Sequence, residues 1–181
     1  TMGIVNTAKD MYALGAPLQL QKGNISFVSQ SGNVGAQLLG WTMSQGIGFG
    51  KFIGTGNEAS IHCEDVLAYF GDDPDTDLIL AYIEGLENGQ LFVERCIRAS
   101  ERKPVIALKS GRTEAGSRAA RSHTGSLAGS DDIYDAAFRQ SGVIRAESSQ
   151  EMLDLAKSFG RIPLPRGNRM GILTLGGGWG V

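Results

Sequence analysis

The chain contains the run Leu78-Ile79-Leu80-Ala81-Tyr82-Ile83, in which apolar side chains follow one another without a charged interruption. Such continuous hydrophobicity is typical of a strand in a parallel sheet, because helices cover both faces of that sheet. Similar short runs occur at 25–29, 50–54, 104–108 and 143–145. Segments of helical length lie between and after them, and the sequence predicts helices near 33–45, 61–71, 88–102, 130–141 and 149–160. This alternation predicts an α/β fold, a doubly wound parallel sheet with right-handed crossovers.

Both ends of the chain differ from this central part. Residues 1–22 have few periodic apolar positions, so we expect an irregular linker there. Residues 161–167 contain two prolines, which is typical of a linker between domains. A new strand is expected at 170–175, where it leads into a glycine run that would continue as a further strand–helix unit. The sequence therefore predicts one central domain between these two ends, within a longer protein.

The composition restricts the class of protein. With 181 residues and 41% hydrophobic content the chain can build a proper core. Its net charge of −2 argues against a nucleic-acid binder or a membrane-surface binder, since both usually carry a strong basic excess. No apolar run approaches the roughly 20 residues that span a bilayer. Cys63 and Cys96 lie far apart, in no metal-ligand spacing, so we expect core cysteines and a cytoplasmic protein.

In an open α/β sheet, functional residues gather where the strands end. Ser31, Gly32 and Asn33 lie between the first apolar run and the first expected helix. Exposed backbone amides at a helix start attract anions, and a glycine there lets a phosphate come close. The alternative is that Ser31 or Asn33 merely caps the helix. The stretch lacks a P-loop lysine and the G-x-G-x-x-G pattern, so neither standard nucleotide fingerprint is present.

Two further strand ends carry acidic residues. Gly56, Asn57 and Glu58 form a small polar loop after the second apolar run, and we expect them near the substrate. A turn capped by Ser60 would explain this loop equally well. Glu84 ends the run quoted above, which is an expensive place for a carboxylate without a partner. A carboxylate that orients a histidine ring and fixes its tautomer is familiar in catalytic sites.

His123 lies in the stretch 121–129, which is built mostly from small residues and precedes an expected helix. A neutral imidazole nitrogen can act as a nucleophile near neutral pH; a plain surface-loop histidine is the alternative. Basic residues lead into the stretch and favour an anionic ligand: Lys109, Arg112, Arg118 and Arg121. Together with Glu84 and the helix start, His123 predicts a phosphohistidine site. No cluster of side chains in the sequence has a usable metal-ligand spacing.

The chain carries five motifs in one order: Ser29-Gln30-Ser31-Gly32-Asn33, Thr55-Gly56-Asn57-Glu58-Ala59, Asp73-Pro74-Asp75-Thr76, Tyr82-Ile83-Glu84-Gly85 and Ser122-His123-Thr124-Gly125-Ser126-Leu127-Ala128-Gly129. Together they resemble the NDP-forming acyl-CoA synthetases. These are the ADP-forming acetate–CoA ligases, relatives of the succinyl-CoA synthetase alpha subunit. The resemblance implies that 23–166 is a flavodoxin-like succinyl-CoA-synthetase domain. It also implies that 1–22 joins from a preceding CoA-binding domain and that 167–181 begins a further, truncated ligase-CoA domain.

The resemblance implies roles for individual residues. His123 matches the histidine that becomes phosphorylated in this family. Glu84 matches the glutamate that hydrogen-bonds its imidazole. The residues expected to hold the phosphoryl group lie at the helix start and beside the histidine: Ser31, Gly32, Asn33, Gly125 and Ser126.

The reaction implied by the resemblance is acyl-CoA + ADP + phosphate ⇌ carboxylate + CoA + ATP, through an acyl phosphate and phosphohistidine. Coenzyme A, ADP or ATP, and Mg²⁺ would then be used by the full-length enzyme and bound mainly outside this chain. The expected partners are CoA-binding and ATP-grasp domains or subunits, in an oligomer. Two alternatives stand beside this interpretation. One is an acyl-CoA-synthetase-like regulatory module of a protein lysine acetyltransferase, and the other is a flavodoxin-like scaffold without chemistry.

Overall fold

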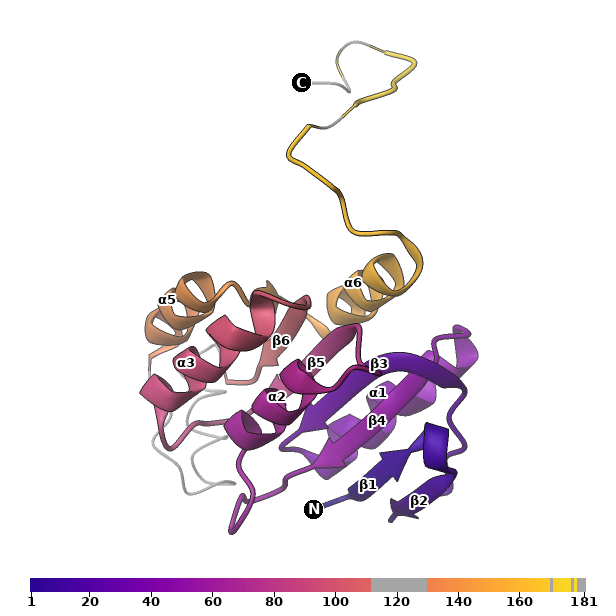
Figure 1. The fold of residues 1–181 in the computed structure, drawn as a ribbon, viewed down its shortest axis with the longest axis vertical. Coiled ribbons are helices and arrows are strands. Elements are labelled where there is room, and N and C mark those ends of the chain that lie inside the picture. The colour runs from indigo at the N-terminus through magenta and orange to yellow at the C-terminus, as the bar shows by residue number, and fades with distance from the viewer. Residues whose placement is uncertain (112–129, 170, 177, 179–181) are drawn as a thin grey trace.

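The computed structural model describes residues 1–111, 130–169, 171–176 and 178. It contains a seven-stranded sheet in the order β2-β1-β4-β3-β5-β6-β7 (Figure 1). The strands are β1 Gly3–Asn6, β2 Met11–Leu14, β3 Lys22–Ser29, β4 Phe49–Gly54, β5 Leu78–Ile83, β6 Val105–Lys109 and β7 Ile144–Ala146. The described helices are α1 Gly32–Ser44, α2 Cys63–Asp72, α3 Gly89–Ser100, α5 Asp131–Ser141 and α6 Ser149–Arg161, with a 3₁₀ turn at Thr7–Lys9.

Five neighbouring strands of the sheet are parallel, in the order β4-β3-β5-β6-β7. This is the strand order of flavodoxin-like folds, so the expected doubly wound parallel sheet is confirmed. The chain leaves β3 toward β4 on one side and later returns to place β5 on the other side. The carboxyl ends of β3 and β5 therefore flank the topological switch point, where ligands bind in such sheets.

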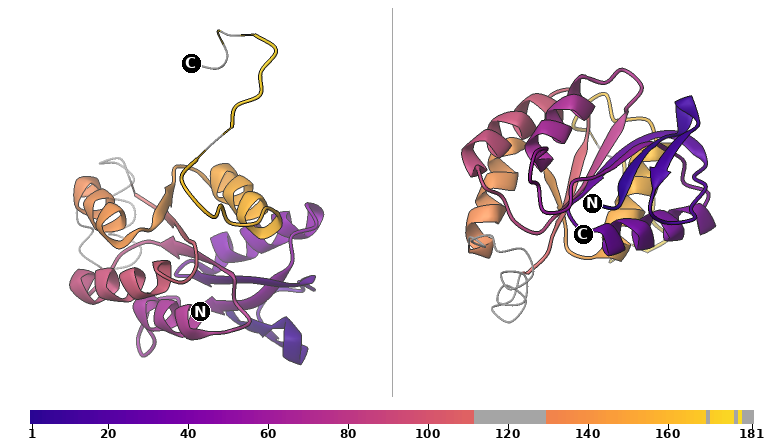
Figure 2. Two further views of the ribbon diagram at one scale, coloured as in Figure 1. Left: turned by 45° about the horizontal axis from the view of Figure 1, so that its top comes forward. Right: turned by 90° about the horizontal axis from the view of Figure 1, so that it is seen from below.

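Helices cover both faces of the sheet (Figure 2). Helices α1 and α6 pack on one face, over a core that includes Phe27 and Leu80. Helices α2, α3 and α5 pack on the other, over a core that includes Val28 and Ala81. Successive strand residues thus point into opposite cores, which explains why the strands are apolar without alternation. No described helix combines the length and hydrophobicity that crossing a membrane would require.

The expected bounds of the central elements agree with the structure to within three residues. Strand β5 is formed by the six residues expected. Helix α2 begins two residues later than expected, at Cys63. Cys63 and Cys96 are both fully buried free thiols, as expected for core cysteines. Burial raises the pKa of each thiol, so neither resembles a reactive cysteine.

The expectation that residues 1–22 are irregular was wrong. Strands β1 and β2 form a hairpin, and β1 extends the sheet by pairing antiparallel with β4. Two residues anchor this addition: Val5 is fully buried, and the buried hydroxyl of Thr7 donates to the Phe49 carbonyl at 2.7 Å. The sequence does not predict the hairpin because each strand has only four residues and exposes apolar side chains, Ile4 in β1 and Met11 in β2.

The prediction of a strand at 170–175 was also wrong, as far as residues 171–175 are described. Residues 171–175 form no ladder with the sheet, and Leu173 and Leu175 are fully exposed. A strand needs a neighbour to bond its backbone, and the chain after α6 runs away from the sheet (Figure 1). The apolar pattern alone therefore does not form a strand at this place.

A buried ion pair links β4 to the turn after α2. The Lys51 ammonium lies 2.6 Å from the Asp73 carboxylate, and both side chains are 8% exposed. Thr76 also donates to this carboxylate and shares a 2.7 Å hydrogen bond with Ser26 of β3. Burial would raise the pKa of Asp73, but the hydrogen bonds from Lys51 and Thr76 outweigh it and hold that pKa below its usual value. The motif at 73–76 therefore has a structural role.

We expect Lys51→Met to lower the free energy of unfolding by about 3–5 kcal/mol, because it leaves the Asp73 carboxylate buried without its cation. The measurement is equilibrium urea unfolding of the 181-residue chain, whose two cores are formed by the described elements. Arg102→Ala is the matched control. It breaks an ion pair with Asp72 in which both side chains are more than 60% exposed, and we expect at most about 1 kcal/mol.

The pH dependence gives a second measurement of the same pair. The pKa of Asp73 is lowered in the folded state, so its contribution to stability is present above the unfolded pKa. That contribution is lost as pH falls through the lowered folded pKa. Without Lys51 the acid-sensitive part of the stability should shrink. Equal losses for Lys51→Met and Arg102→Ala would contradict this account of the pair.

Candidate functional site

The candidate site lies at the switch point, where β3 and β5 end. Gln30 follows β3, and Glu84 and Gly85 follow β5. The Gln30 side chain spans the gap: its Oε1 accepts from the amides of Glu84 at 2.5 Å and Gly85 at 3.1 Å. Its Nε2 donates to the Gly85 carbonyl at 2.7 Å. Sequence reasoning missed Gln30 as a separate element of the site, although it lies within the first family motif.

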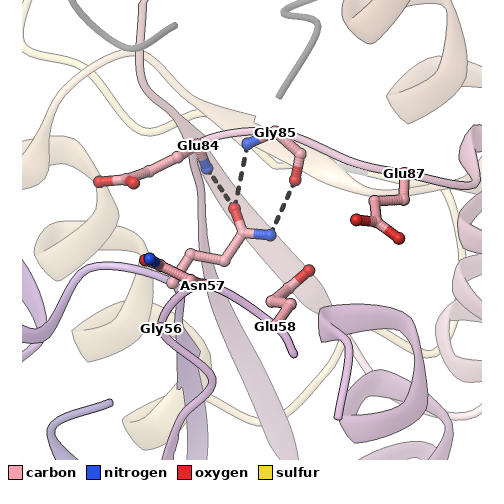
Figure 3. A pocket seen from close by; sticks show the side chains of 7 residues that line it. Gly56, Asn57, Glu58, Glu84, Gly85 and Glu87 are labelled. Carbon is pink, nitrogen blue, oxygen red and sulfur yellow. Dashed lines mark hydrogen bonds between the residues drawn. The ribbon is translucent and has the colours of Figure 1, made fainter. Parts of the chain in front are cut away.

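A small pocket of about 50 Å³ opens beside these hydrogen bonds (Figure 3). This is room for a few waters or a small ion. Its lining brings together the three residues expected near the substrate, the glutamate that follows β5, and three further residues: Gly56, Asn57, Glu58, Glu84, Gln30, Gly85 and Glu87. The loops after β3, β4 and β5 thus meet at one edge of the sheet, as expected for parallel strands.

The start of α1 lies at the same edge. Ser31 is the N-cap of α1, and its hydroxyl accepts from the Val34 amide at 3.4 Å, so the capping interpretation is confirmed. Gly32 opens the helix and Asn33 is exposed. Capping uses the Val34 amide and leaves the Gly32 and Asn33 amides without an acceptor in the helix. The helix start therefore keeps donors that an anion could use, but the described residues alone do not test that role.

Glu58 organises the loop after β4. It is 9% exposed, and its Oε1 accepts from the Thr55 hydroxyl and the Cys63 amide, both at 2.9 Å. The second bond gives an acceptor to the Cys63 amide in the first turn of α2, so the side chain of Glu58, and not that of Ser60, caps this amide. Its backbone has φ +54°, a strained region for a residue with a side chain. Such strain is common at functional sites and is held here by the two hydrogen bonds.

His62 sits at the start of α2, between two carboxylates. Its Nδ1 lies 3.8 Å from Glu58 and 3.9 Å from Glu87, and 29% of its side chain is exposed. It is the N-cap residue of α2. Among the described residues no group of three or more acidic, histidine or cysteine side chains could hold a metal ion.

Asn57 and Glu58 also line a second cavity, of about 590 Å³, on the β1 side of the loop. Apolar side chains from three different segments contribute to its wall: Ile4, Ile53 and Ile61. The loop after β4 therefore separates the small polar pocket from a larger, partly apolar cavity.

Glu84 is half-buried and points its carboxylate away from Glu58 and Glu87 (Figure 3). On the side away from β3, strand β5 pairs with β6, and Lys109 of β6 lies opposite Ile83. Lys109 is 4% exposed, and its ammonium stands 4.5 Å from the centre of the Tyr134 ring. Burial lowers the pKa of Lys109, while the negative charges of Asp131 and Glu84 act against that shift. The negative charge of Glu84 therefore stabilises the charged form of the buried Lys109 ammonium.

Several residues predicted for the site lie outside the described part of the chain. They are His123, Gly125 and Ser126, together with the basic residues Arg112, Arg118 and Arg121. The contact between Glu84 and His123 is therefore a prediction that the described residues do not test. Helix α5 begins at Asp131, directly after this stretch, and lies against β7 and α3.

A family model described as a succinyl-CoA ligase like flavodoxin domain matches residues 22–159. The chain belongs to this family. The match begins at the first residue of β3 and ends within α6, so it spans the five parallel strands and both layers of helices.

Curated relatives carry this flavodoxin-like domain within longer chains. The alpha subunit of acetate–CoA ligase (ADP-forming) II of Pyrococcus furiosus is 48% identical over 180 residues, which are 99% of this chain and 39% of that subunit. The acetate–CoA ligase (ADP-forming) of Methanocaldococcus jannaschii is 46% identical over 180 residues, 99% of this chain and 25% of that protein. The chain thus spans about two fifths or less of these two relatives.

Solved structures show the same fold. The apo dinucleotide-forming acetyl-coenzyme A synthetase 1 of Ca. Korarchaeum cryptofilum superimposes with a TM-score of 0.89 at 40% identity, over 98% of this chain and 38% of that chain. A second structure of that synthetase, in complex with phosphate and ADP, gives a TM-score of 0.87 over 92% of this chain and 36% of that chain.

Proposed function

We propose that this chain is the phosphohistidine-bearing domain of an ADP-forming acyl-CoA synthetase. The full-length enzyme catalyses acyl-CoA + ADP + phosphate ⇌ carboxylate + CoA + ATP. The observation that carries the proposal is the meeting of the α1 start and Glu84 at the switch point, bridged by Gln30. It occurs in a chain that is 42–48% identical to five curated ADP-forming ligases over at least 87% of its length.

In the proposed mechanism His123 carries the phosphoryl group between two sites. A lone pair on an imidazole nitrogen attacks the phosphorus of an acyl phosphate, and the bond to the carboxylate oxygen breaks. Glu84 accepts a hydrogen bond from the other ring nitrogen and so fixes the tautomer of the ring. The amides at Ser31, Gly32 and Asn33 donate to the phosphoryl oxygens. Gly125 and Ser126 supply further donors beside the histidine.

Coenzyme A, the nucleotide and Mg²⁺ belong to other parts of the enzyme in this proposal. The described residues offer no phosphate-clamping loop with a lysine and no acidic cluster for a metal ion. The acyl-CoA, ADP and Mg²⁺ sites are then provided by CoA-binding and ATP-grasp domains or subunits. Those partners deliver acyl phosphate and ADP to the same His123, in an oligomer in the cytoplasm. Gly56, Asn57 and Glu58 lie closest to the arriving substrate.

The proposal predicts phosphate uptake by the full-length protein. Incubated with γ-labelled ATP and Mg²⁺, it should take up label that is acid-labile and base-stable, as phosphohistidine is. We expect stoichiometry near one per chain. Label that survives acid but is lost in base would place the phosphoryl group on a serine or threonine and contradict the proposal.

The 181-residue chain alone is the negative control of this experiment. It should remain unlabelled, because phosphoryl transfer needs a nucleotide and metal site that its described residues do not provide. Adding the ATP-grasp partner should restore slow labelling, since the missing linkage lowers the effective concentration of the two sites. Stoichiometric labelling of the isolated chain by ATP would mean that its own residues bind the nucleotide.

A further inference from the structure

The side chain of Gln30 joins the two halves of the candidate site. The residue directly after it, Ser31, caps α1, and the turn it binds carries Glu84. Its backbone amide also donates to the Tyr82 carbonyl at 3.2 Å, which fixes the position of Gln30 beside β5. One residue therefore contacts the β5 end through its backbone and the turn after it through its side chain.

The three hydrogen bonds leave one orientation for the amide group of Gln30. Two backbone N–H groups point at one atom of the side chain, so that atom is the oxygen. The opposite atom faces a carbonyl and is the nitrogen. Gln30 is 8% exposed and Gly85 is buried, so water does not readily replace these bonds. The backbone at Glu84 is thereby fixed relative to the start of α1.

We propose that Gln30 is a positioning residue of the phosphoryl-transfer site, which holds the Glu84–Gly85 turn in register with the N-terminus of α1. The inference rests on the proposed function and names a residue that acts through Glu84. Gln30 itself touches neither histidine nor phosphate in this scheme. A misplacement of about 1 Å in such a carboxylate can slow a reaction about 100-fold.

The first test is a double-mutant cycle on the full-length protein, with the single-turnover rate of phosphohistidine labelling as the measurement. Gln30→Met keeps the side-chain length but makes none of the three hydrogen bonds, and we expect a 10- to 100-fold loss, in the range of a misplaced catalytic group. If Gln30 acts through Glu84, the double variant with Glu84→Gln should be at most about threefold slower than Glu84→Gln alone. Losses that multiply in the double variant would overturn the inference.

A second variant uses the pH profile. The carboxylate introduced by Gln30→Glu can accept from both backbone amides, but when ionised it has no proton to donate to the Gly85 carbonyl. Protonation restores the donor and acceptor set of the glutamine. The labelling rate of Gln30→Glu, relative to the wild type at each pH, should therefore rise as pH falls. A flat ratio across the pH range would contradict the role of the Nε2 donor.

Ser26→Ala is the matched control for loss of a buried hydrogen bond. Ser26 lies on the same strand, β3, and its hydroxyl shares a 2.7 Å hydrogen bond with Thr76. We expect a lower midpoint of thermal unfolding and a labelling rate within about twofold of the wild type. A loss of labelling as large as that of Gln30→Met would show that destabilisation alone explains the effect and would overturn the inference.

Hydrogen exchange separates this inference from the proposed function. The Glu84 and Gly85 amides should exchange at least about tenfold faster in full-length Gln30→Met than in the wild type, and at the wild-type rate in Ser26→Ala. Unchanged protection in Gln30→Met would overturn the inference even if histidine labelling is normal. Absence of acid-labile label in the wild type would instead overturn the proposed function, and the exchange result would still decide whether Gln30 holds the turn.

Discussion

Replacing His123 by alanine in the full-length protein is expected to abolish ADP-dependent ATP formation and acid-labile phosphate labelling together. Alanine has no nucleophilic nitrogen, so the covalent pathway through phosphohistidine is closed. The loss should reach at least about three orders of magnitude, because removing a covalent nucleophile leaves only the residual effects of binding. The measurements are the rate of ATP formation from acyl-CoA, ADP and phosphate, and the label incorporated from γ-labelled ATP.

The second histidine of the chain is the matched control. His62 is the N-cap residue of α2, lies near Glu58 and Glu87, and is 61 positions before His123 in the sequence. In His62→Asn the new residue, asparagine, is a type that caps helices well, so the fold should be retained. We expect labelling within about threefold of the wild type, as for substitutions that remove no reacting group. Normal turnover in His123→Ala, or loss of label in His62→Asn alone, would contradict the assignment of the nucleophile.

The parallel part of the fold could be predicted because burial on both faces leaves a strong mark on the sequence. Strand β5 shows this best, since its side chains point alternately into the two cores and all are apolar or aromatic. The β1–β2 hairpin could not be predicted in the same way. It lies at the edge of the sheet, and side chains such as Ile4 and Tyr12 are more than a third exposed. Its strands are held by long-range pairing, since β1 pairs with β4 and β2 pairs with β1.

The site could be predicted in part. Glu84 and the loop with Glu58 could be named as candidates because they are polar and follow the ends of strands. The sheet places both in the lining of one pocket. Gln30 could not be singled out, because its partners are 54 and 55 residues away in the sequence. Its role follows only from the adjacency of β3 and β5. The bond from the Cys63 amide to Glu58 could not be predicted either, and a turn capped by Ser60 therefore stayed open as an alternative: the carboxylate of Glu58 reaches Cys63 through a backbone turn with positive φ.

Glu84→Gln should lower the rate of phosphohistidine formation by roughly two to four decades, as found for carboxylates that orient a catalytic histidine. Glutamine keeps the size of the side chain and leaves the bonds from Gln30 intact, because those bonds go to the backbone of residues 84 and 85. The variant therefore tests the charge of the carboxylate and not the shape of the turn. In the full-length protein we expect a hydrogen bond of about 2.6–3.2 Å between Glu84 and an imidazole nitrogen of His123.

Glu87→Gln distinguishes a specific role of Glu84 from a general effect of acidic residues in the pocket. Glu87 lines the same pocket, but 73% of its side chain is exposed and it faces His62. Its charge is screened by solvent, so we expect a loss of less than about tenfold. Similar losses in both variants would mean that the net charge of the pocket, not the orientation of His123, sets the rate. A crystal structure of the full-length enzyme with Glu84 out of reach of His123 would exclude the role, because a carboxylate fixes a tautomer only through a direct hydrogen bond or one bridging water.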